Sequence, residues 1–160
     1  MRAGSHRARA HTYGYTFVAV LVLLALCSLG LAVAGPVWSD QVKREREQEL
    51  LRVGNLFAQA ISNYREAFPG SLKQYPPSLE ALLLDSRYVG TVRHLRAVYD
   101  DPVNPGQPWG LLLDGDNRVK GVFSQSTASP VAQGQLKLPG LVLAPAAHYA
   151  DWKFTVTPKP

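Results

Sequence analysis

The chain has 160 residues, enough for one modest domain with appendages, and its formal net charge is +5. The charge is unevenly placed, because Arg2, Arg7 and Arg9 precede a long apolar run and all 12 acidic residues lie at Asp40 or later. The remainder is nearly neutral and shows no basic face interleaved with aromatic residues, so the sequence indicates no nucleic-acid partner. The single cysteine, Cys27, excludes an intramolecular disulfide and is expected to be a buried small apolar residue.

The apolar run is the first predicted element. Residues 15–37 carry no formal charge. As a helix they would span about 34 Å, which exceeds a hydrocarbon core of about 30 Å. The arginines before the run, and their absence just after it, predict a cytoplasmic N-terminus and a body on the outer side.

The residues of this run alone allow three interpretations. One is an uncleaved signal anchor. The second is a secretory signal that ends at the small-residue pattern of residues 32–34, Ala-Val-Ala. The third is a leader that is removed before the apolar run, so that the apolar helix is kept.

The third interpretation rests on a resemblance. Residues 14–18, Gly-Tyr-Thr-Phe-Val, resemble the G/F-T-L-[IL]-E signature of type IV prepilins and type II secretion pseudopilins. The resemblance implies that residues 1–14 are a basic prepilin-type leader and that prepilin peptidase cleaves between Gly14 and Tyr15. It also implies methylation of the new amino terminus at Tyr15.

The same resemblance assigns further residues to a helical spine that assembles with other subunits. These assembly residues are Thr16, Phe17, Ala19 and Pro36, with a kink expected at Pro36. The family usually has glutamate where this chain has Ala19, and a few minor pseudopilins at filament tips lack it. The chain is therefore interpreted either as a minor or initiating subunit or as a member of a divergent branch.

Residues 15–38 are predicted to be the transmembrane half of the spine, and residues 39–68 its amphipathic half. A new helical start is possible at Ser39 or Asp40. Apolar residues then recur at spacings of three and four, which predicts a helix with one apolar stripe: Leu50, Val53, Phe57, Ala60, Ile61, Tyr64 and Phe68. Pro69 and Gly70 are expected to end it.

The start of the amphipathic half is rich in both charges. Its spacing predicts ion pairs of Lys43 with Glu47, of Arg46 with Glu49, and of Glu49 with Arg52. Two interpretations stay open. The stretch is either a solvated helical face or a surface that pairs with neighbouring subunits.

Residues 69–160 are predicted to be a small periplasmic α+β head. Ser78 is expected to cap a short helix that buries Leu79, Leu82 and Leu83. Residues 109–113 and 118–124 flank an Asp-Gly-Asp-Asn turn and predict a β-hairpin, and residues 151–156 alternate as a last strand does. Residues 125–150 are expected to form an irregular loop.

The head resembles that of the major pseudopilin G class, in which the region of this loop holds calcium. Residues 125–150 contain no acidic residue, and calcium needs several oxygen ligands, so no metal is expected there. Asp114, Asp116 and Asn117 are explained by turn chemistry. His94 and His148 are isolated, and no nucleophile motif or phosphate loop is present. We therefore expect no enzyme and no cofactor.

The expected fold is α+β: a long N-terminal helical spine with a transmembrane first half, packed on a small antiparallel sheet as in pilins. The expected function is that of a structural pseudopilin-like subunit of a type II secretion or type IV pilus-like system. Prepilin peptidase would process it in the bacterial inner membrane, and an inner-membrane assembly platform would build it with other pseudopilin subunits into a short periplasmic filament. Its expected partners include membrane lipid and exclude nucleic acid. The alternative is a single-pass anchored or secreted periplasmic binding domain unrelated to filaments.

Overall fold

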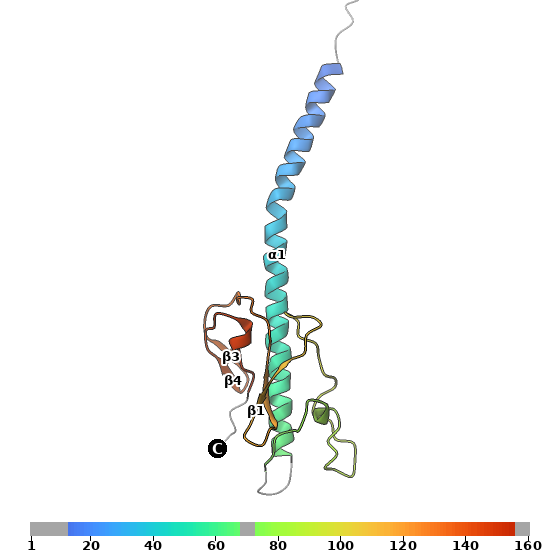
Figure 1. The fold of residues 1–160 in the computed structure, drawn as a ribbon. Helices are drawn as coiled ribbons and strands as arrows, with labels where there is room; N and C mark the ends of the chain where they lie inside the picture. The colour runs from blue at the N-terminus through green and yellow to red at the C-terminus, as the bar shows by residue number, and fades with distance from the viewer. Residues whose placement is uncertain (1–12, 68–72, 156–160) are drawn as a thin grey trace, which may run out of the picture. The chain divides into compact units, whose positions relative to one another are not determined.

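The computed structural model describes residues 13–67 and 73–155, and within these it leaves the side chains of residues 13–14 and 29–37 undescribed. The chain divides into two compact units, Met1–Val42 and Lys43–Pro160. We call the second unit the head. Figure 1 shows its hairpins beside the part of helix α1 that belongs to it.

Helix α1 spans Tyr13–Glu66, 54 residues. The helical assignment continues through Gly35 and Pro36, so the new helical start expected at Ser39 or Asp40 is wrong. Leucine, valine and alanine dominate the first half, and of these leucine and alanine favour the helix. The residues expected to end the helix, Pro69 and Gly70, lie outside the described residues.

The predicted membrane crossing is contradicted. Across the residues that the structure describes, no helix has a stretch long and apolar enough to span a bilayer. The transmembrane assignment of residues 15–38, and with it the single-pass location in the bacterial inner membrane, is therefore corrected.

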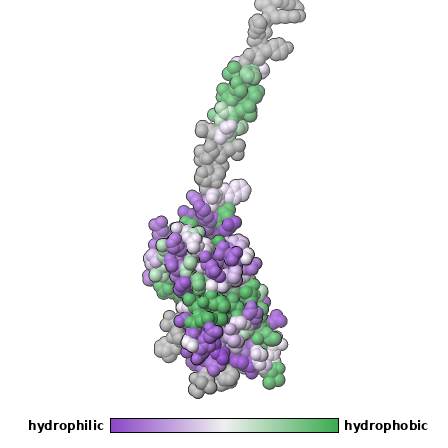
Figure 2. All heavy atoms as spheres, viewed as in Figure 1, coloured by the Kyte–Doolittle hydropathy of each residue, from purple (hydrophilic) through white to green (hydrophobic). Residues whose placement is uncertain are grey.

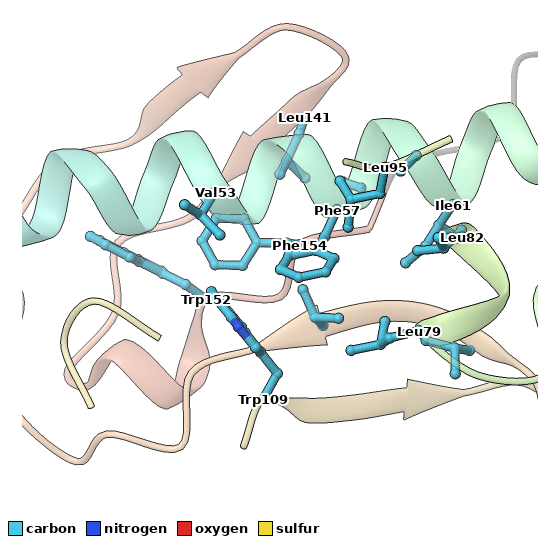
Figure 3. Packing of buried hydrophobic residues seen from close by; sticks show 14 of the residues in the cluster. Val53, Phe57, Ile61, Leu79, Leu82, Leu95, Trp109, Leu141, Trp152 and Phe154 are labelled. Atoms are coloured by element: carbon cyan, nitrogen blue, oxygen red, sulfur yellow. The ribbon is translucent and has the colours of Figure 1, made fainter. Parts of the chain in front are cut away.

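The core of the head is built on the predicted stripe of α1. Its buried members follow spacings of three and four, which places them on one helix face: Leu50, Val53, Phe57, Ala60, Ile61 and Tyr64. Figure 3 shows Phe154 and Trp152 packed against this face, with Leu79 and Leu82 farther along the helix. The predicted apolar stripe is thus confirmed from Leu50 to Tyr64.

The predicted hairpin is confirmed. Strand β1, Gly110–Leu113, pairs antiparallel with β2, Val119–Phe123, and the register shifts between Leu112 and Leu113. In the turn, Asp114 Oδ1 accepts hydrogen bonds from the backbone N–H groups of Asp116 and Arg118, at 3.0 and 2.9 Å. The turn closes through Asn117 at a φ of 58°, a left-handed conformation that asparagine tolerates.

The loop at residues 125–150 is less irregular than expected. It contains a second hairpin, in which β3, Leu136–Leu138, pairs antiparallel with β4, Leu141–Leu143. Pro139 and Gly140 form its turn, with Gly140 at a φ of 76° that favours glycine. Over the residues that the structure describes, two small antiparallel sheets therefore replace the single predicted sheet, and the α+β class is confirmed.

Two short elements differ from expectation. The helix expected after Ser78 is the single 3-10 turn η1, Glu80–Leu82, and Ser78 does not cap it, because the N-cap position belongs to Leu79. The strand expected at residues 151–156 is instead a 3-10 turn, η2 at Tyr149–Asp151, followed by one antiparallel bridge between Phe154 and Val122.

Candidate functional site: the exposed apolar segment

Residues 15–28 of α1, which we call the apolar segment, are exposed on every side. Seven valine and leucine side chains are each about half exposed or more: Val18, Val20, Leu21, Val22, Leu23, Leu24 and Leu26. Because successive helix residues point about 100° apart, these positions cover the whole circumference. Figure 2 shows this part of α1 as a hydrophobic surface. Soluble monomers rarely leave such a patch uncovered, and one usually marks a binding surface.

The residues predicted for processing and assembly lie at the start of this segment. Helix α1 begins at Tyr13, so Gly14 and Tyr15 occupy its first turn. The side chains of Tyr15 and Phe17 are 82% and 66% exposed, and Thr16 is also exposed. The predicted junction thus lies in the first turn of α1, followed directly by the exposed residues Tyr15, Thr16 and Phe17.

Of the other two predicted assembly residues, the structure describes the side chain of Ala19 but not that of Pro36. Ala19 is exposed on the second turn of α1, and the first turn contains no acidic residue. The positive end of the helix dipole is therefore not balanced by a carboxylate of its own turn. Pro36 lies within α1, and its side chain is outside the described residues.

Cys27 is exposed, contrary to the expectation that it is buried. Within the chain itself, the described residues around Cys27 are all exposed as well, from Tyr15 to Ser28. The thiol therefore reports directly on anything that covers this segment.

A buried carboxylate in the head was missed by the sequence reasoning. Glu47 on α1 is only 6% exposed. Its carboxylate accepts hydrogen bonds from the backbone N–H groups of Val131 and Ala132, at 2.6 and 3.0 Å, and from the hydroxyl of Tyr149, at 2.9 Å. We call this group the Glu47 clamp. It fastens the loop at residues 125–150 to α1, and burial together with Glu47 raises the pKa of Tyr149 to about 12.

The Glu47 clamp changes the expected charge pairing. The ion pair expected between Lys43 and Glu47 is wrong, because the Glu47 carboxylate is turned to the loop instead. Among the residues with described side chains, Glu49 pairs with Arg52, at 2.6 Å, and not with Arg46. The Glu49–Arg52 pair is exposed, and the hydrogen bond from Arg52 lowers the pKa of Glu49.

A second buried carboxylate organises the segment after η1. Asp85 is 1% exposed and accepts hydrogen bonds from Arg87 Nε and Nη2, at 2.8 and 2.6 Å. His94 Nε2 lies 3.1 Å from the same carboxylate. Arg87 also stacks over the ring of Tyr64, with its Cζ 3.6 Å from the centroid, and donates to the Tyr64 carbonyl at 2.7 Å. The Arg87 hydrogen bond, supported by His94, lowers the pKa of Asp85 to about 2.

Asp101 and Ser124 form a further buried polar pair. Ser124 donates to Asp101 at 2.6 Å, and Asp101 also accepts from the Val103 N–H. The His94 ring lies beside Asp85 and not beside Ser124. Over the described parts of the chain, no three His, Cys, Asp or Glu side chains gather as metal ligands.

No family model, curated protein or solved structure matches this chain. Its function is therefore argued from its own residues. Among the described surfaces, the apolar segment departs most from what a soluble monomer exposes.

Proposed function

We propose that this chain is a structural pseudopilin-like subunit of a type II secretion or type IV pilus-like system. In this proposal the apolar segment packs against the helices of other subunits in a short filament. The observation that carries the proposal is the exposure of valine and leucine around the whole circumference of residues 15–28. A helix with this surface needs partners on all sides, and the interior of a helical filament supplies them.

The energy of burial supports assembly. Burying a valine or leucine side chain completely is worth about 1.5–3 kcal/mol, so covering one that is half exposed is worth roughly 1 kcal/mol. The seven half-exposed side chains of the apolar segment lie on a helix that is already formed. Their summed burial is comparable to the lower estimates of the cost of association, and contacts along a filament add to it.

The proposal includes processing by prepilin peptidase between Gly14 and Tyr15. Cleavage there removes Arg2, Arg7 and Arg9 and leaves the apolar segment on the mature protein. The mature N-terminus, determined by mass spectrometry of protein from its own host, tests this step. The expected result is a chain that starts at methylated Tyr15.

Two variants separate this processing from secretory cleavage. Gly14→Ile is expected to block cleavage before Tyr15, because a branched side chain replaces the small residue at the cut. Ala34→Phe removes the small residue that a secretory signal needs, and it is expected to leave processing unchanged. A mature start at Gly35, or an intact Met1, contradicts the proposal and supports the alternative of a binding domain unrelated to filaments.

The thiol of Cys27 tests assembly directly. A maleimide is expected to label Cys27 quickly in the isolated subunit, where the residue is exposed, and at least about tenfold more slowly after assembly. The matched control is a Cys27→Ser chain that carries Ser86→Cys on the exposed surface of the head, which is expected to react equally in both states. Equal labelling of Cys27 before and after assembly contradicts burial of the apolar segment.

Ala19 bears on the place of the subunit in the filament. The exposed first turns of α1 carry no carboxylate that would pair with the amino terminus of a neighbour. We therefore propose a minor or initiating position for the subunit. Ala19→Glu is expected to shift it towards incorporation along the filament, measured by its copy number per filament. An unchanged copy number removes the support for a tip position.

A further inference from the structure

A groove on the head is lined by apolar side chains and two carboxylates. Its volume is about 270 Å³, and its principal lining residues are Leu79, Glu80, Tyr99, Asp100, Trp109 and Leu111. We call it the head groove. Trp109 and Leu79 are buried, whereas 43% of Leu111 remains exposed, so the apolar lining is open to solvent.

We propose that the head groove binds an extended segment of a partner protein that carries one large apolar side chain and, two positions away, a lysine or arginine. The apolar side chain lies against Leu111 and Trp109, and the cation lies beside Glu80 and Asp100. This binding does not depend on filament assembly, because the head groove lies wholly within Lys43–Pro160.

The size of the head groove favours a side chain over a free small molecule. Pockets that enclose small ligands usually measure about 300–1,000 Å³ and bury most of the ligand. At about 270 Å³ and open to solvent, the head groove falls below that range. It suits one anchor residue of a protein partner, with the polar rim that surrounds such anchors in interfaces.

The charge around the head groove favours a cation. Glu80 and Asp100 are both exposed, and no lysine, arginine or histidine belongs to the lining. Within the described part of the chain, Asp100 has no hydrogen-bond or ion-pair partner. The Ser78 hydrogen bond lowers the pKa of Glu80, so Glu80 is ionised at neutral pH. Arg52 lies 5.8 Å from the centre of the Tyr99 ring, but its charge is paired with Glu49.

The apolar wall of the head groove is held in place before any partner arrives. Trp109 Nε1 donates to the Tyr99 carbonyl at 2.8 Å. The Trp109 ring meets Phe57 and Phe154 edge to face, with centroids 5.3 and 6.4 Å away. A preorganised wall loses little conformational entropy on binding.

The strand that supplies Leu111 favours an extended partner segment. Strand β1 is hydrogen-bonded to β2 alone in its two-stranded sheet, as far as the structure describes it. In the described structure the other edge of β1 therefore has no partner strand, and an edge of this kind can accept an added strand. An extended segment gains these bonds while its side chains reach the head groove.

The probe for the test is a short capped peptide with leucine and lysine two positions apart and threonine between them, labelled for fluorescence anisotropy with the full-length protein. In an extended strand this spacing places both side chains on one face. Saturable binding that weakens as salt is added is expected, because exposed charges are screened. The same peptide with glutamate in place of lysine is expected to bind at least about tenfold more weakly, which corresponds to about 1.4 kcal/mol.

Leu111→Lys and Leu113→Lys form a matched pair of variants. Both residues belong to β1 and both are 43% exposed, but only Leu111 lines the head groove. Leu111→Lys is expected to weaken lysine-peptide binding at least about tenfold, and Leu113→Lys by less than about twofold. Leu111→Thr, a smaller change at the same position, keeps the test valid if Leu111→Lys fails to fold, and near-UV circular dichroism checks each variant.

The contribution of the carboxylates is tested in the same way. Asp100→Asn is expected to weaken binding severalfold and to reduce its salt dependence, whereas Asp116→Asn, outside the head groove, is expected to change neither. Three results overturn the proposal: no binding of the lysine peptide at millimolar concentration, equal binding of both peptides, or equal effects of the two leucine variants.

Discussion

The carboxylate of Glu47 accepts a hydrogen bond from the hydroxyl of Tyr149, 102 positions farther along the chain, with the two oxygens 2.9 Å apart. The same carboxylate accepts two backbone N–H groups of the loop at residues 125–150. One side chain of α1 therefore satisfies three donors from a region that holds no acidic residue of its own.

Glu47→Gln is expected to lower the free energy of unfolding by about 2–3 kcal/mol. The amide keeps the volume, but it replaces a charged acceptor and turns a donor towards the loop N–H groups. Tyr149→Phe removes one of the three bonds and is expected to cost about 1 kcal/mol. Urea unfolding measures both, with the exposed Glu66→Gln as the control, expected to stay within about 0.5 kcal/mol. An equal effect of Glu47→Gln and Glu66→Gln would show that the clamp adds nothing to stability.

The lowered pKa of Asp85 is expected to make the protein less stable in acid. Its pKa is lowered from 3.8 to about 2, so the folded state favours the ionised carboxylate. The resulting stability, about 2 kcal/mol, is present above pH about 4 and is lost as the pH falls through about 2. The free energy of unfolding is measured as a function of pH. In Asp85→Asn it is expected to fall less between about pH 4 and pH 2 than in the unchanged protein. The exposed Asp116→Asn is expected to leave this fall unchanged, and identical acid profiles for the two variants contradict the assignment.

Gly54 is expected to tolerate no larger residue. A Cβ at this position would lie 2.5 Å from Phe154 ring atoms, well inside van der Waals contact. Alanine gains about 1 kcal/mol of helix propensity over glycine, but the overlap in a packed core costs more, so a net loss of about 2 kcal/mol is expected for Gly54→Ala. The control Gly90→Ala meets nothing within 4 Å. Thermal unfolding compares them, and an unchanged melting temperature for Gly54→Ala contradicts the close approach.

The turn between β1 and β2 is expected to accept few residue types in place of Asn117. Its φ of 58° is a conformation that β-branched residues avoid. Asn117→Val is expected to cost about 1–2 kcal/mol, and Asn117→Gly to be nearly neutral. Asp116→Val serves as the control for valine in the same turn. Chemical unfolding measures all three, and a tolerated Asn117→Val would refute the strain argument.

The parts of the fold that were predicted from sequence are those with a local signal. The stripe of α1 repeats every three to four residues, and the β1–β2 turn has its own chemistry at Asp114 and Asn117. At residues 151–156 the alternation is real, because Trp152 and Phe154 are buried and Lys153 is exposed. The backbone pairing there is a single bridge, so the burial pattern was correct and the strand was not.

The parts that were missed depend on distant residues or on very short elements. Strands β3 and β4 have three residues each, too few to establish an alternation. Glu47 lies in a stretch where charges occur on all sides, and its burial is decided by Val131 and Tyr149 far along the chain. No local pattern encodes that contact. The predicted site at Gly14, Tyr15, Thr16, Phe17 and Ala19 rests on a short resemblance, so its function stays a prediction.

The contact between Gly54 and Phe154 has a consequence for how the protein is made. During translation the stripe of α1 emerges early, whereas Phe154 and Trp152, which cover it, emerge late. Until then Leu50, Val53 and Phe57 have no cover from the C-terminal part of the head. A truncated chain therefore shows the apolar stripe that the finished head conceals, which gives chaperones and proteases a direct way to tell an incomplete product from a complete one.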